Sequence, residues 1–170
     1  MSIDPIYLTP DGILRAITLW PEWVWAIHHL DKRIENRSWE IPRGEWFGLH
    51  AGKHVGGRKG GPATIEGWEG VRAMAAAAGW TPATGTWRYF DFKKGDRSVS
   101  RDPTLPLESH IHGLLRVKDY VYRGSAAWFA PGQVGNVFDY VPLAKPVPCK
   151  GEQGLWTVQE DVRAQLEVGR

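Results

Sequence analysis

The sequence holds very little cysteine: Cys149 is the single one among 170 residues. One cysteine excludes an intramolecular disulfide and a multi-cysteine zinc site, and it fits a reducing compartment. Cys149 lies between Pro148 and Lys150, with no base beside it in the chain. We therefore expect a buried bystander thiol and not a nucleophile, since a reactive cysteine needs a neighbour that stabilises its thiolate.

Long apolar runs and a strong excess of charge are also lacking. No apolar stretch approaches the roughly 18 residues that a membrane-spanning helix needs. The opening MSIDPIYLTPDG has neither the cationic start nor the apolar core of a secretory signal. These absences predict a cytoplasmic protein without a membrane partner. The formal net charge is +2, so the overall charge points to no class of partner.

Glycine, proline and tryptophan are plentiful by contrast. The 20 glycines and 12 prolines favour many turns and short strands over a helical bundle, and a hydrophobic fraction of 42% is enough for a packed core. At this length, residues 1–170 are expected to form a single domain. Turn-forming residues gather at about 79–108, which predicts an insertion with a loop or hairpin in that region.

The spacing of apolar residues predicts both helices and strands. A helix is expected over residues 22–30, directly after Pro21, and a second over residues 64–78, where one face is apolar. Strands are expected over residues 14–20, 33–39, 45–51, 86–92, 109–122, 136–141 and 155–158, with a proline-rich connector before the last strand and a terminal helix over 160–168. This order predicts an α+β fold around a curved or barrel-like sheet.

Half of the ten tryptophans and a compact group of charged residues lie within residues 20–53. The tryptophans are Trp20, Trp23, Trp25, Trp39 and Trp46. Strand alternation over 33–39 places Glu35 and Arg37 on the same face, and Lys32 comes just before this strand. Fixed charges beside aromatic rings suit a flat ligand that forms hydrogen bonds, such as a nucleobase.

Two later segments are rich in basic residues. Residues 51–61 carry three basic side chains and no acidic one, and residues 88–101 carry five basic side chains against two acidic ones. Such loops on a near-neutral body can contact phosphates, although two solvated loops would produce the same pattern. The glycine-rich stretch at 54–61 lacks the GxxxxGK[ST] spacing of a P-loop, so a nucleotide-binding loop of that kind is not expected.

The histidines offer a further candidate site. His28 and His29 fall on the first predicted helix, and His110 and His112 share one face of a later strand. With His50 they have the side chains for a metal site, but nothing in the sequence brings them together. We therefore expect solvent-facing or hydrogen-bonded histidines, with no metal and no cofactor.

Three blocks of the chain resemble the ASCH domain, a member of the PUA-like superfamily. Residues 30–37, LDKRIENR, are similar to its GxKxxExR signature, with Lys32, Glu35 and Arg37 at the charged positions and Leu30 in place of the glycine. The flanks agree: LWPEW resembles the opening slWqPWA, the stretch ending in HAGK resembles RTW…RGplliHAgk, and PCKGEQGLW resembles the closing p.kGkqGLW. The resemblance covers about residues 14–54 and 110–158, and the region at 79–108 has no recognised counterpart.

The resemblance implies a PUA-like β-barrel with flanking helices and a cleft beside the first helix, and it implies binding of RNA or DNA. Arg37 and Lys32 can meet phosphate or base acceptors, and Glu35 can accept from a base or orient Lys32. Trp20 and Trp39 can stack on a base. The alternative is an ion pair that only braces the sheet and contributes little, ~0–1 kcal/mol at a surface.

We therefore expect a nucleic-acid-binding module, for RNA in the first place, that recognises a base or nucleotide. DNA or a modified nucleoside is the alternative partner. The expected ligand-binding residues are Lys32, Glu35, Arg37, Trp20, Trp39, His50, Lys53, Arg58 and Lys59.

Hydrolysis is the alternative class of function. ASCH-like relatives include small bacterial amidohydrolases that deacylate acylated cytidine with a lysine, a threonine and a glutamate, and some relatives are reported as ribonucleases. Their threonine lies three residues after the lysine, where this chain has Glu35. Lys32 and Glu35 then remain as an acid–base pair for N4-acylated cytidine or cytosine, or for single-stranded RNA. The sequence leaves binding and catalysis open.

Overall fold

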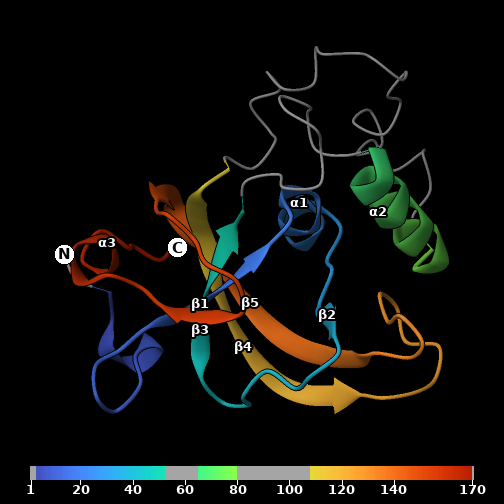
Figure 1. Cartoon of the computed structure of the whole chain (residues 1–170), viewed down its shortest axis with the longest axis horizontal. Coiled ribbons are helices and arrows are strands. Elements are labelled where there is room, and N and C mark those ends of the chain that lie inside the picture. Colours follow the sequence, from blue (N-terminus) through green and yellow to red (C-terminus); the bar gives the residue numbers. More distant parts are fainter. Residues whose placement is uncertain (1–2, 53–64, 80–107, 170) are drawn as a thin grey trace.

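The protein has an α+β fold in which a curled, mixed sheet of six strands forms a half-barrel accompanied by few helices (Figure 1). The computed structural model describes residues 3–52, 65–79 and 108–169, with the backbone alone for 65–69. The elements are η1 (Pro5–Tyr7), β1 (Arg15–Leu19), α1 (Pro21–His29), β2 (Ile34–Arg37), β3 (Trp46–Ala51), α2 (Ile65–Ala77), β4 (His110–Val121), β5 (Val134–Pro148), β6 (Leu155–Thr157) and α3 (Glu160–Arg163). The predicted strand at 86–92 and nearly all of the insertion at 79–108 lie outside the described residues.

The strands follow the order β2-β5-β4-β3-β1-β6, so β2 and β6 form the two edges of the sheet. β1 runs parallel to β3, and every other neighbouring pair is antiparallel. The parallel pair follows from the chain path, because α1 and β2 separate β1 from β3 and allow the crossover that parallel strands need. The sheet is therefore mixed, and Figure 1 shows its curled outline.

Both faces of the sheet are covered, as strand alternation requires. In β1, Ile17 and Leu19 pack in a core cluster with Val24 and Ile27 of α1. Ala16, which alternates with them, belongs to a second cluster on the opposite face. Each fully buried branched side chain of this kind stabilises the fold by roughly 1.5–3 kcal/mol. α1 is thus held to one face of the sheet by its own apolar side.

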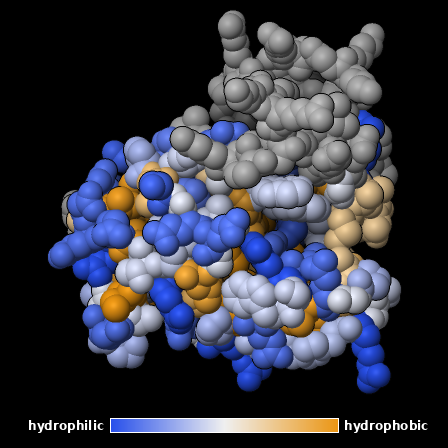
Figure 2. Space-filling model, in the orientation of Figure 1, coloured by the Kyte–Doolittle hydropathy of each residue, from blue (hydrophilic) through white to orange (hydrophobic). Residues whose placement is uncertain are grey.

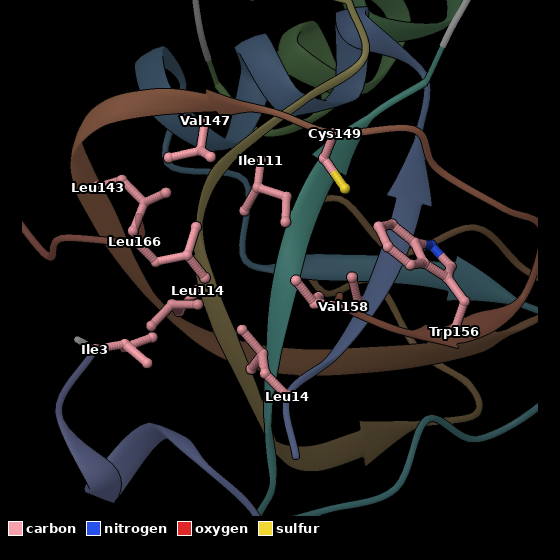
Figure 3. Packing of buried hydrophobic residues seen from close by; sticks show 11 residues of the cluster. Ile3, Leu14, Ile111, Leu114, Leu143, Val147, Cys149, Trp156, Val158 and Leu166 are labelled. Carbon is pink, nitrogen blue, oxygen red and sulfur yellow. The ribbon is translucent and has the colours of Figure 1, made fainter. Parts of the chain in front are cut away.

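The C-terminal segment closes the opposite face. Figure 3 shows Leu166 beside Leu143 and Leu114, and Cys149 with its sulfur directed toward Trp156. Cys149 is 8% exposed, and burial raises the pKa of its thiol. The expectation of a buried thiol is confirmed, and a raised pKa disfavours the reactive thiolate.

β5 is much longer than the predicted strand at 136–141. It continues to Pro148 through the region that the sequence indicated as a proline-rich connector. β4 pairs along most of one edge of β5, but β2 pairs with the other edge only from Val134 to Val137. A proline lacks the N–H that a central strand needs, and Pro142 and Pro146 lie where β2 has already ended. The connector prediction was wrong because proline is tolerated at such an edge.

α3 is shorter than the predicted helix over 160–168 and ends at Arg163. The chain beyond it returns to β5, where the Ala144 N–H donates to the Glu167 carbonyl and Leu143 forms a bridge with Val168. This pairing replaces the last helical turns. Of the helices in the described part of the chain, none is long and apolar enough to cross a membrane.

The face of the molecule in Figure 2 is mostly hydrophilic, with apolar areas scattered between charged ones. Among the described residues, the large apolar side chains that are exposed are Ile6 at 67%, Tyr122 at 57% and Trp20 at 47%. Trp20 lies between β1 and α1 in the chain.

Candidate functional site

The turn after α1 brings Lys32 beneath the helix. α1 begins at Pro21, whose fixed φ suits the first helical position, and the Trp20 carbonyl accepts the first helical hydrogen bonds. At the other end, the N–H groups of Leu30 and Lys32 both donate to the Ala26 carbonyl, and Asp31 between them has φ 52°. Aspartate tolerates this left-handed conformation better than most residues. The reversal therefore needs no glycine at position 30.

Lys32 is a buried cation whose donors are engaged by the protein. Its side chain is 1% exposed, and its Nζ donates to the Ile34 carbonyl and, over 3.0 Å, to Glu35 Oε2. The same Nζ lies 5.4 Å from the centre of the Trp23 ring, at cation–π distance. Burial lowers the pKa of Lys32; Glu35 opposes this shift, and the charge of Arg37 adds to it.

Glu35 is shared between two cations. Its side chain is 9% exposed, with Oε2 bound to Lys32 and Oε1 3.0 Å from Arg37 Nε. The Arg37 Nε–H is not aligned with this oxygen, so the second contact is an ion pair without a hydrogen bond. β2 holds Glu35 in place because the Asn136 side chain of β5 donates to the Glu35 carbonyl and accepts from the Ile41 N–H.

Arg37 joins two strands that are far apart in the sheet. Its Nη2 donates to the Thr18 carbonyl of β1 over 3.1 Å, although β5, β4 and β3 lie between β2 and β1. The contact therefore runs across the open side of the half-barrel. The Arg37 side chain is 27% exposed, and its Nη1 donates to no atom of the described residues. The sequence did not predict the contact between Arg37 and Thr18, because nothing in the residue spacing connects positions 18 and 37.

The tryptophans of this region divide between core and surface. Trp25 is 1% exposed and belongs to the core beneath α2, and Trp46 is half-buried between Tyr7 and Arg116. Trp23 and Trp39 are also half-buried and pack on the cluster under α1. Trp20 is 47% exposed, which is the largest exposed fraction among the tryptophans of this group.

His50 makes no hydrogen bond or ion pair with Lys32, Glu35 or Arg37 among the described residues, although it shares Thr18 with Arg37. It is 1% exposed; its Nε2 is 3.0 Å from the Cys149 carbonyl, and its Nδ1 is 3.2 Å from the Thr18 hydroxyl. Its ring also packs edge-on against Trp156, which belongs to the cluster closed by the C-terminal segment. His50 thus anchors the segment that begins at Cys149 to the sheet. The other predicted basic residues, Lys53, Arg58 and Lys59, lie outside the described residues.

The structure brings four histidines together, which the sequence did not anticipate. The ring centres of His28 and His112 are 5.9 Å apart, those of His28 and His29 6.1 Å, and those of His110 and His112 6.4 Å. Within the described ranges, no group of three or more His, Cys, Asp or Glu side chains is arranged to hold a metal ion. The Tyr140 hydroxyl lies 2.9 Å from His28 Nε2.

His28 is held in its neutral form. Its ring keeps an exposed surface, yet desolvation by its neighbours and the charges of His112, His29 and Arg33 lower its pKa from 6.5 to about 4. A neutral ring at pH 7 fits the Tyr140 contact, because one ring nitrogen can then accept from the hydroxyl. We assign the group a role in joining α1 to β4 and β5.

Comparison with known proteins adds no family to this picture. No model of a known protein family matches the chain, and a search of curated proteins found no relative. The geometry therefore carries the functional argument. Chemically, the site of Lys32, Glu35 and Arg37 offers a guanidinium that is held in place by Glu35 and the Thr18 carbonyl, while the carboxylate and the ammonium are engaged with each other.

Proposed function

We propose that this protein is an ASCH domain of the PUA-like superfamily that binds nucleic acid, RNA in the first place, and holds a nucleotide at Lys32, Glu35 and Arg37. The observation that carries the proposal is the state of Arg37. Its guanidinium is fixed between Glu35 and the Thr18 carbonyl, while its Nη1 edge is left for a ligand. A guanidinium held in this way loses little freedom on binding, and pre-organisation of that kind favours affinity.

Two further features support the proposal. The half-barrel with α1 packed on one face is compatible with the barrel-like fold of the family. Trp20 follows Thr18, whose carbonyl binds Arg37, by two residues in the chain and is 47% exposed. Stacking of one base on an aromatic ring contributes about 1–3 kcal/mol. Cation and ring together suit a nucleotide better than either does alone.

Hydrolysis fits the geometry less well. An acid–base pair of Lys32 and Glu35 must reach a substrate or a water molecule, but both side chains are buried and are engaged with each other. Oε1 of Glu35 is turned toward Arg37, and the Lys32 Nζ is also bound to the Ile34 carbonyl. We therefore favour binding, and we keep acylated cytidine and single-stranded RNA as substrates to be assayed for turnover.

The test is fluorescence anisotropy with labelled single- and double-stranded RNA and DNA at ~50 mM salt, followed by a salt titration. Arg37→Gln should weaken binding strongly, and Arg123→Gln, which removes a positive charge from an exposed position, should leave it nearly unchanged. Absence of binding to all four probes would overturn the proposal. Turnover of acylated cytidine or RNA that disappears in Lys32→Ala would replace it with the hydrolase alternative.

A further inference from the structure

The charges of Lys32, Glu35 and Arg37 do not balance among these three residues. Lys32 and Arg37 both rely on the Glu35 carboxylate, so two cations share one anion. Glu35 and Arg37 are also the charged groups that act on the pKa of Lys32. With Lys32 protonated, these three residues carry one positive charge in excess, in a place where Lys32 is 1% exposed. Arg37, the second cation, is 27% exposed, so this excess charge is partly desolvated and a bound anion neutralises it.

The hydrogen-bond donors show where such an anion can bind. An ammonium has three donors; Lys32 Nζ donates to Ile34 and Glu35 and lies 5.4 Å from the centre of the Trp23 ring. The guanidinium of Arg37 has five donors, and the one hydrogen bond it makes within the described residues runs from Nη2 to the Thr18 carbonyl. The Nε–H is buried in the ion pair with Glu35, so the two N–H groups of Nη1 and the second N–H of Nη2 are the donors left in the described part of the chain. A ligand therefore meets the site through Arg37.

We propose that the free edge of Arg37 binds a phosphate group, so that Lys32 and Glu35 position the arginine and the site recognises the backbone of a nucleic acid and not a base. The inference rests on the function proposed above and narrows it. Two parallel N–H donors of a guanidinium match two oxygens of a phosphate, which allows a bidentate contact. Trp20 is then the residue on which the attached base stacks.

Recognition of a base amino group by Glu35 is the competing arrangement, and the contacts oppose it. Oε2 already accepts from Lys32, and Oε1 is 3.0 Å from Arg37. A base would have to displace one of these cations from a carboxylate that is only 9% exposed. A phosphate displaces neither cation, because it uses Arg37 donors that make no hydrogen bond to residues 3–52, 65–79 or 108–169.

The experiment uses the full-length protein and a set of single-stranded RNA oligonucleotides that are identical except for one phosphate. In each, a different internal phosphate is replaced by a neutral methylphosphonate, and one further oligonucleotide lacks its 5′-phosphate. We expect one position at which neutralisation lowers affinity at least tenfold. A loss on removing the 5′-phosphate would assign the site to a terminal phosphate, and a loss at an internal position would assign it to a diester. Guanosine and cytidine should bind far more weakly than their 5′-monophosphates, and inorganic phosphate should compete.

Variants separate the role of Arg37 from general stability. Arg37→Lys keeps the positive charge but cannot make the bidentate contact. In this variant, the affinities for the unmodified RNA and for the RNA with the critical phosphate neutralised should differ much less than in the native protein. Its salt dependence should stay near that of the native protein, whereas Arg37→Gln should lower the slope of log K against log salt by about 0.7 for the one lost contact on a single strand. Arg123→Gln is the matched control. The oligonucleotide series needs only the native protein, so it remains decisive if a variant fails to fold.

The outcomes distinguish this inference from the function on which it rests. If RNA binds but no single methylphosphonate matters, and guanosine binds as tightly as its monophosphate, the site reads a base and the inference is overturned. If no oligonucleotide and no mononucleotide binds, the proposed function fails together with the inference.

Discussion

The guanidinium of Arg37 in β2 donates a hydrogen bond to the carbonyl of Thr18 in β1 over 3.1 Å, although three strands separate β2 from β1. The curl of the sheet brings these distant strands face to face, and one side chain spans the opening. Any ligand at Arg37 therefore lies at the open side of the half-barrel, next to the start of α1. The curvature of the sheet therefore determines where the site lies, together with the spacing of Lys32, Glu35 and Arg37 in the chain.

Removal of Lys32 should destabilise the protein more than removal of a surface lysine. Lys32→Met leaves the buried Glu35 with Arg37 alone, and breaking a buried ion pair in this way costs about 3–5 kcal/mol. Lys118→Met is the control, because the exposed pair of Lys118 and Asp139 contributes only ~0–1 kcal/mol. Urea unfolding of both variants measures the difference. Equal losses would show that the Lys32 cluster is not effectively buried.

The histidine group should make stability depend on pH. The folded-state pKa of His28 is about 4, below its ordinary value of 6.5, so the unfolded chain binds more protons between these values. The contribution of His28 is therefore complete above pH 6.5, declines as the pH falls toward 4, and does not change further below that. Thermal unfolding between pH 7 and 4 should show this decline.

His28→Gln should reduce, but not abolish, the loss of stability between pH 7 and pH 4. The remaining slope has the same sign, because burial also lowers the pKa of His29 and His50. Identical slopes in the native protein and in His28→Gln would contradict the assignment of the shift to His28.

Gly151 should tolerate no side chain unless His50 is reduced in size. A Cβ at Gly151 would overlap the His50 ring, which is 1% exposed and bound to the Cys149 carbonyl. Overpacking of this kind costs roughly 1–3 kcal/mol. Gly151→Ala should therefore be destabilising in the native protein and close to neutral in the His50→Ala background. A double-mutant cycle by urea unfolding tests this, and strict additivity of the two losses would refute the contact.

Trp20 and Trp25 should respond to truncation in opposite ways. Trp20→Ala removes a ring that is 47% exposed and should weaken RNA binding by about 1–3 kcal/mol with little loss of stability. Trp25 is 1% exposed, and Trp25→Ala should cost about 3–5 kcal/mol of folding free energy. Anisotropy and thermal unfolding, measured on both variants, separate the two effects. A Trp20→Ala protein that binds RNA with native affinity would remove this ring from the proposed site.

Local patterns were sufficient for the elements that carry the site. Helical spacing after Pro21 predicted α1 to within one residue at either end, and alternation along 33–39 predicted that Glu35 and Arg37 lie together, which their 3.0 Å contact confirms. β5 was underestimated because three prolines usually end a strand. Whether they do so depends on whether another strand pairs at that edge, which sequence alone does not show.

The sequence by itself determined the short-range part of this protein: the helix, the strands around it, and a lysine, a glutamate and an arginine spaced so that one carboxylate meets two cations. These contacts form between residues at most five positions apart, so local backbone geometry decides them. Tertiary structure alone decided which donors remain for a ligand, that Thr18 would hold Arg37, that His50 would turn to Cys149, and that four histidines would meet. Each of these depends on sheet order and curl, which arise from contacts between segments distant in the chain.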